Sequence, residues 1–160
     1  MAAIAILLVA QSDAFAQSRL EAGTKAEAVA GSEAMLERNY ALADSLFGAA
    51  EGWNGAAAGQ ISLNRGMALA GEGNTDGALK AFQRAAAQSE APGIKADAWN
   101  NVGNLLLGSE DVEGAIEAYK TSLRLDPRDA ETRYNLNLAM AMRQQQEQQQ
   151  QEQQQEQQQQ

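Results

Sequence analysis

The chain has 160 residues, of which 44% are hydrophobic, and because many of these are alanine it can hold one modest, helix-rich domain. Its net charge of −9 and pI near 4.5 argue against binding nucleic acid or an anionic membrane surface. Cysteine and histidine are both absent, which excludes disulfides, thiolate nucleophiles, histidine-based catalytic pairs and conventional zinc or haem sites. We therefore expect no enzymatic activity, no cofactor and no metal.

Residues 1–16 have the pattern of a secretory signal peptide. The segment from Ala2 to Ala10 is apolar, and Ala14 and Ala16 place small residues where a signal peptidase reads them, so we expect cleavage before Gln17. The run is shorter than the roughly 20 residues of a membrane-spanning helix, so no span is expected after cleavage. Since no Lys or Arg precedes the run, two alternatives stay open: an uncleaved membrane-attached segment, or a buried helix of the first repeat. Residues 17–23 follow as a short linker or as the frayed start of the first helix.

Three stretches that share one pattern come next, over about residues 24–57, 59–91 and 96–129. In each, a glycine in a first predicted helix is followed at fixed spacing by an alanine and then an aromatic residue in a second predicted helix. The first stretch carries the pattern weakly, because the first of its two predicted helices is poor in large apolar residues. This is common in a terminal unit of a repeat array. Its recognisable positions are Gly31, Ala43, Phe47 and Ala50.

The second stretch shows the pattern more clearly. Two of its positions depart from it, where Ser62 replaces a Trp and Arg65 replaces a Leu. The glycines of residues 71–77 follow a predicted helix rather than a strand, and no Lys-Ser or Lys-Thr pair comes after them, so this loop is interpreted as a hairpin turn and not as a phosphate cradle. The matching residues are Gly66, Leu69, Ala78 and Phe82.

The third stretch is nearly complete. Its first helix is predicted from about Lys95 to Leu107, residues 108–111 break it, and a second helix runs to about Leu125. Small residues are needed where the two antiparallel helices cross, while aromatic residues fill the volume beside the crossing. The residues that match are Trp99, Val102, Gly103, Leu106, Ala115, Tyr119 and Pro127.

This spacing, in a unit of roughly 34 residues, resembles the tetratricopeptide repeat family. The resemblance implies an all-α fold, an α-solenoid of about three helical hairpins whose first helices line a concave face that binds segments of other proteins. A capping helix over residues 130–143 is expected to cover the last hairpin through Leu136, Ala139 and Met140. From Gln144 to Gln160 the composition is almost entirely glutamine, so this low-complexity tail is either disordered or a solvated helical extension.

Three asparagines recur two residues before the Gly-equivalent position of the pattern, namely Asn64, Asn101 and Asn135. In some tetratricopeptide proteins such residues form a ladder that holds the backbone of a bound peptide, and the resemblance implies the same here, with Asn100 and Asn104 as further candidates. The alternative is that they are ordinary consensus residues on a solvated face. A clamp for a terminal carboxylate is not expected, because Asp97 and Glu131 stand where cations would be needed.

The combination of a secretory start, the repeats and a glutamine-rich tail resembles the tetratricopeptide members of the bacterial aerotolerance (Bat) group. That resemblance implies a non-enzymatic scaffold of the periplasm or cell envelope, working beside membrane proteins that carry von Willebrand factor A domains. A general adaptor or chaperone for envelope assembly or secretion is the alternative.

Overall fold

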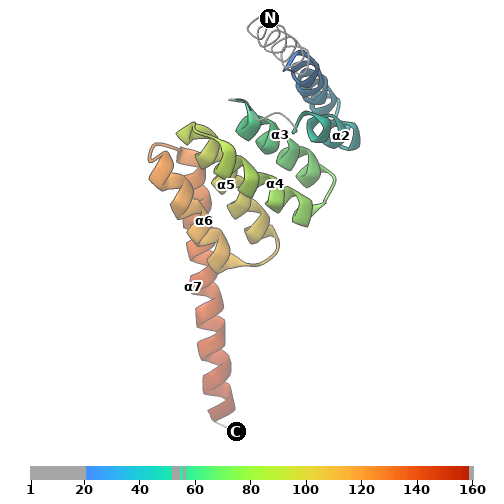
Figure 1. The fold of residues 1–160 in the computed structure, drawn as a ribbon. Helices are drawn as coiled ribbons and strands as arrows, with labels where there is room; N and C mark the ends of the chain where they lie inside the picture. The colour runs from blue at the N-terminus through green and yellow to red at the C-terminus, as the bar shows by residue number, and fades with distance from the viewer. Residues whose placement is uncertain (1–20, 52–54, 56, 159–160) are drawn as a thin grey trace, which may run out of the picture.

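The computed structural model describes residues 21–51, 55 and 57–158, and within these ranges the chain folds into helices without a strand (Figure 1). The all-α prediction is therefore confirmed. The expected signal peptide, residues 1–16, lies outside the described residues. Of the two alternatives for residues 17–23, the described residues 21–23 follow the second, because they are the start of a helix. No helix in the described ranges combines the length and the apolar run that a membrane span requires.

The helices pair as three hairpins followed by one long helix. A helix over residues 21–36 pairs with α2, α3 pairs with α4, and α5 pairs with α6 (Figure 1). The bounds are α2 Tyr40–Ala50, α3 Ala58–Gly71, α4 Thr75–Gln88, α5 Pro92–Gly108, α6 Val112–Leu125 and α7 Ala130–Gln158. Pro92 is the first residue of α5, where its missing N–H has no helical partner to lose.

All three hairpin turns are built in the same way. A residue in the left-handed region precedes an N-cap residue, as in Gly73 (φ 80°) followed by Asn74. The N–H of each cap residue bonds back to the first helix, and its side-chain oxygen accepts from the second helix, which satisfies donors that the helix ends would leave free. The other two pairs are Arg38 with Asn39 and Glu110 with Asp111.

The seam of each hairpin is a glycine lying directly under an aromatic ring. A Cβ added to Gly103 would lie 2.4 Å from the Tyr119 ring, and one added to Gly66 would lie 2.5 Å from the Phe82 ring. Gly31 has the same relation to Phe47, at 2.9 Å. Since real Cβ atoms do not approach so closely, only glycine lets the two backbones pack at these distances.

These aromatic residues, rather than Trp99, form the centres of the core. Phe47, Phe82 and Tyr119 are fully buried, whereas Trp99 is only partly buried and packs against the edge of the central cluster. Trp99 and Tyr119 were both expected to fill the volume beside the helix crossing; Tyr119 is fully buried there, whereas Trp99 keeps part of its surface exposed. Ala78 and Ala115 are buried at the crossings, as their small size predicts.

Arg65, which takes the place of a leucine, ties the first hairpin to the second. Its Nε lies 2.7 Å from Asp44 of α2, and its Nη1 lies 2.5 Å from Glu51. Arg84 of α4 also contacts Glu51, at 2.6 Å. The carboxylates raise the pKa of Arg65, with the hydrogen bond to Asp44 as the main cause. The network replaces an apolar contact between repeats with a directional one.

The last helix, α7, is longer than the capping helix expected over residues 130–143. Its first turns pack on α6, where Ala139 is fully buried, and the helix then continues through the glutamine tail to Gln158. Between the two alternatives for the tail, the structure therefore has the solvated helical extension (Figure 1).

The seam glycines lead to a stability prediction. Replacing Gly103 with Ala should destabilise the fold by about 1–3 kcal/mol, because the Tyr119 ring must move. Thermal and urea unfolding followed by circular dichroism measure this loss. Gly108 is the matched control: it also lies in α5 but has no atom within 4 Å of the added Cβ, so Gly108→Ala should be neutral or slightly stabilising. Equal unfolding midpoints for the two variants would contradict the proposed seam.

Candidate functional site

The first helices of the hairpins lie on the inside of the array. Among the described elements, α3 contacts α5 and α5 contacts α7, whereas α2, α4 and α6 do not contact one another. The first helices are therefore closer together than the second helices, and the array curves around them. The inner face consists of the exposed sides of residues 21–36, α3, α5 and α7.

Asn64, Asn101 and Asn135 lie on three successive helices of this inner face and are each partly exposed. In each amide, one polar group already has an intramolecular partner. Asn64 Oδ1 accepts from Gln60 at 2.9 Å, Asn101 Nδ2 donates to the Asp97 carbonyl oxygen at 2.8 Å, and Asn135 Nδ2 donates to Asn104 at 3.2 Å. These bonds hold the side chains in place, while the remaining donor or acceptor of each amide has no recorded partner among the described residues.

The other two candidate asparagines have different surroundings. Asn104 Oδ1 accepts from Asn135 and also from the Tyr119 hydroxyl at 2.8 Å, so it connects the core of the third hairpin to α7. Asn100 Oδ1 is buried and has no hydrogen-bond partner in the described part of the chain. Burial raises the pKa of Tyr119 to about 12, because the charged phenolate would lose its solvation.

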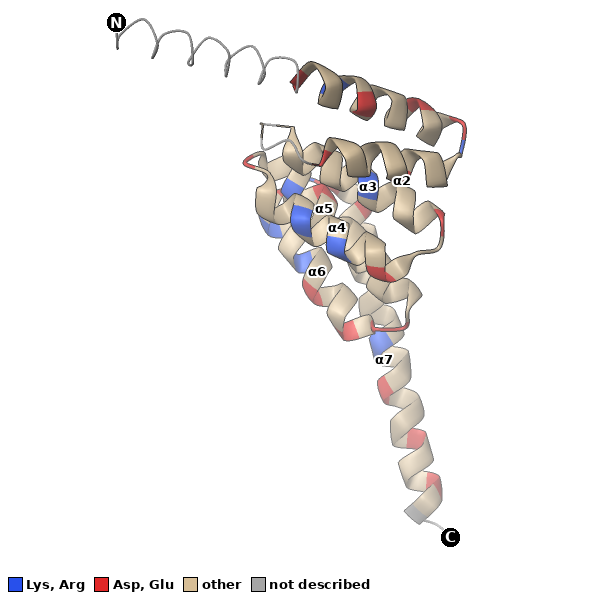
Figure 2. Cartoon of the chain, turned by 45° about the vertical axis from the view of Figure 1, so that its right-hand side comes forward, with Lys and Arg blue, Asp and Glu red and all other residues tan. Residues whose placement is uncertain are grey.

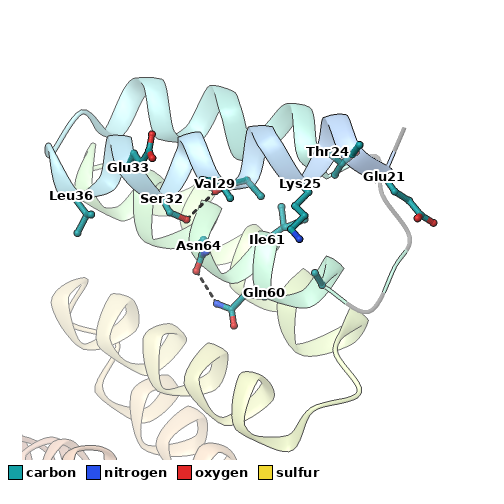
Figure 3. Close-up of a pocket in the computed structure, with 13 residues that line it drawn as sticks. Glu21, Thr24, Lys25, Val29, Ser32, Glu33, Leu36, Gln60, Ile61 and Asn64 are labelled. Carbon is teal, nitrogen blue, oxygen red and sulfur yellow. Dashed lines mark hydrogen bonds between the residues drawn. The ribbon is translucent and has the colours of Figure 1, made fainter. Parts of the chain in front are cut away.

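A groove opens between the helix of residues 21–36 and α3, at the amino-terminal end of the inner face (Figure 3). It encloses about 700 Å³, and its surface is mainly apolar. Val29 and Leu36 from the first helix and Ile61 from α3 supply apolar surface, while Lys25, Gln60 and Asn64 supply polar groups. Asn64 therefore belongs both to the row of asparagines and to this groove.

The carboxy-terminal end of the inner face is acidic. Partial burial raises the pKa of Asp97 on α5, and the nearby charges of Asp129, Asp126 and Glu131 raise it further. Asp129 itself has a lowered pKa, mainly because the Thr132 hydroxyl donates to its carboxylate. Within the described ranges, no group of acidic side chains is arranged to hold a metal ion.

Sequence reasoning identified the asparagine row but missed the groove. The signal that could have predicted the groove is the spacing of its residues from the seam glycine Gly31. That spacing puts Lys25, Val29 and Leu36 at inner-face positions of the first repeat. The signal was weak because the first helix is rich in alanine and has few large side chains. The depth of the groove also depends on how far this helix lies from α3, and a repeat pattern does not contain that distance.

The protonation of Tyr119 provides a test of the site's geometry. Because the pKa is raised in the folded state, the contribution of Tyr119 to stability should be full below pH 10 and lost as the pH rises through about 12. Tyrosinate absorbance, measured against pH in the wild type and in Tyr119→Phe, isolates the titration of this residue. A difference curve centred near pH 10 would show that the hydroxyl is solvated and not buried against Asn104.

Comparison with known families gives a match over the well-formed part of the array. The tetratricopeptide repeat profile matches residues 63–130 and 101–154, which together span residues 63–154. No curated protein sequence matches the chain.

Solved structures share the fold at low identity. The Sgt2 tetratricopeptide domain of Aspergillus fumigatus has a TM-score of 0.65 and 19% identity, over 74% of this chain and 78% of that one. The Arabidopsis OM64 tetratricopeptide domain has a TM-score of 0.69 and 15% identity, over 77% and 98%. The first such domain of Spaghetti (RPAP3), solved with the HSP90 peptide SRMEEVD, has a TM-score of 0.67 and 16% identity, over 75% and 92%.

Proposed function

Because the chain belongs to the tetratricopeptide repeat family, we propose that it is a non-enzymatic scaffold that binds a segment of a partner polypeptide on its inner face. Domains of this family generally mediate protein–protein interaction, and two structural neighbours are solved with bound peptides. The observation that carries the proposal is the row of Asn64, Asn101 and Asn135 on α3, α5 and α7. An amide side chain can pair with the peptide backbone whatever the side chains of the partner.

The binding mode differs from capture of a terminal carboxylate. The peptide in one neighbouring structure, SRMEEVD, is acidic at its end. In this chain Asp97 and Glu131 place negative charge on the inner face, close enough to each other for their charges to interact. An acidic peptide end would be repelled there, so backbone recognition by the asparagines is the mode we propose.

The first prediction for this function concerns the asparagine row. Replacing Asn64, Asn101 and Asn135 together with Ala should weaken partner binding by tens-fold or more, because each lost hydrogen bond costs about 0.5–1.5 kcal/mol. The wild-type chain, used as bait on solubilised cell envelopes, supplies the partner, and calorimetry then measures both affinities. Asn137→Ala, an exposed asparagine elsewhere on α7, is the control and should bind as the wild type does. Wild-type affinity in the triple variant, with an unchanged circular dichroism spectrum, would reduce the row to ordinary consensus residues.

We propose further that the protein works in the cell envelope beside partners that carry von Willebrand factor A domains. The support is the secretory pattern of residues 1–16 together with the resemblance to the Bat group. The same bait experiment separates this role from that of a general adaptor. Recovery of von Willebrand factor A proteins supports it, and recovery of outer-membrane assembly proteins would favour the adaptor.

Export has its own prediction. The mature chain should begin at Gln17, because the small residues Ala14 and Ala16 precede it after an apolar run. Intact mass of the protein purified from a fractionated host measures the new amino terminus. A chain that keeps residues 1–16 and stays in the cytoplasmic fraction would refute export.

A further inference from the structure

The inner face changes its chemistry from one end of the array to the other. The positions six residues before the seam glycines are Lys25, Gln60 and Asp97, and Glu131 occupies the equivalent place on α7. At these four equivalent positions the side-chain charge therefore changes from positive through neutral to negative. The first repeat has no asparagine at the position of the asparagine row. Val29, which is apolar, stands there and corresponds to Asn64 of the second repeat. A ligand lying across the face would meet a different environment at each end.

The amino-terminal end offers apolar surface that no part of the described chain covers. Val29 is 53% exposed and Leu36 is 87% exposed, and both line the groove, with Leu36 at the end away from Ile61 (Figure 3). Burying apolar surface of this kind gains roughly 25 cal/mol per Å². The groove is therefore suited to one or two aliphatic or aromatic side chains of a partner.

The carboxy-terminal end carries a group of carboxylates whose charge is only partly offset, by Arg133 near Asp129. Asp97 lies in the field of Asp126, Asp129 and Glu131, and no ion pair to any of them is recorded among the described residues. Four of the twelve lysine and arginine residues lie on the outer helices α4 and α6 (Figure 2), whereas Lys95 and Arg133 lie on the inner helices α5 and α7. A cation from a partner would relieve the mutual repulsion of these carboxylates.

The spacing of the two ends sets the length of the ligand. Packed helices lie 8–10 Å apart, so the distance from the groove, which lies between the helix of residues 21–36 and α3, to the carboxylates on α5 and α7 is roughly 20 Å. An extended chain advances about 3.3 Å per residue, which corresponds to about six residues. The intervening backbone would run along the asparagine row, past Asn64 and Asn101.

We propose that the inner face binds an extended segment of a partner that carries an apolar anchor in the groove and, about six residues away, a Lys or Arg facing Asp97 and Glu131. This inference rests on the proposed function and names the chemistry of its partner. The occupant is a basic, amphipathic segment, because the apolar groove and the acidic cluster lie on the same face. The preference is opposite in charge to the acidic peptide bound by one of the structural neighbours.

The test is selection of a displayed library of random peptides, about 12 residues long, on the immobilised full chain. A peptide of this length spans about 40 Å when extended, enough to reach both ends of the face. The expected result is enrichment of sequences with an apolar residue about six positions from a Lys or Arg. Selection without a charge preference, enrichment of acidic peptides, or no enrichment at all would overturn the inference.

Two pairs of variants then test which end of the face contacts the cation of the peptide and which end contacts its apolar anchor. The probes are a selected peptide and a copy in which its Lys or Arg is replaced by Glu. The double variant Asp97→Lys, Glu131→Lys should lower the affinity for the basic peptide at least roughly tenfold and raise the affinity for the acidic copy. Glu72→Lys with Glu90→Lys makes the same change of net charge at exposed sites off the inner face and should alter neither affinity. An unchanged preference in the first variant would overturn the assignment of the acidic end.

Val29→Asp with Leu36→Asp should remove binding of both peptides, and Leu42→Asp with Met140→Asp, at exposed apolar residues outside the groove, should not. Equal effects of the two pairs would overturn the assignment of the groove.

The Asn64, Asn101 and Asn135 triple variant separates the inference from the function on which it rests. If selected peptides lose affinity in that variant but show no charge preference, only the inference fails. If the triple variant still binds its natural partner as the wild type does, recognition by the asparagine row, on which the proposed function rests, fails.

Discussion

The close approach of glycine to an aromatic ring is the constraint on which the rest of this structure depends. Gly31, Gly66 and Gly103 each lie under a fully buried ring of the following helix. Because the contact is the same in all three hairpins, the hairpins have the same crossing and present their first helices alike. Any side chain at these positions would separate the helices and expose the ring that each hairpin needs to bury.

The hairpins are joined by less uniform contacts. Between the first two, Arg65 forms ion pairs with Asp44 and Glu51, where a repeat of this family has an apolar residue. Between the third hairpin and α7, apolar packing around Ala139 is accompanied by a chain of hydrogen bonds from Tyr119 through Asn104 to Asn135. The second connection involves residues of the inner face itself, so the geometry of this face is tied to the packing of the core beneath it.

The inner face thus combines a regular element with a varying one. The asparagine row follows the period of the repeats, whereas the groove at one end and the acidic cluster at the other result from residues that differ between repeats. A regular row suits the peptide backbone, which is itself regular, while the differing ends suit particular side chains. Affinity and selectivity can therefore reside in different residues of one surface.

The sequence by itself determined the helical hairpins, because a glycine, an alanine and an aromatic residue recur at the same spacing in three stretches, and Pro127 ends the last of them. It also located the asparagines on the inner face, since helical periodicity fixes which side a residue occupies. Only the tertiary structure decided that Trp99 is partly exposed, that Arg65 reaches two carboxylates of the preceding repeat, and that a groove lies beside α3. These features depend on distances between helices that are far apart in sequence, and a pattern within one repeat contains no information about them.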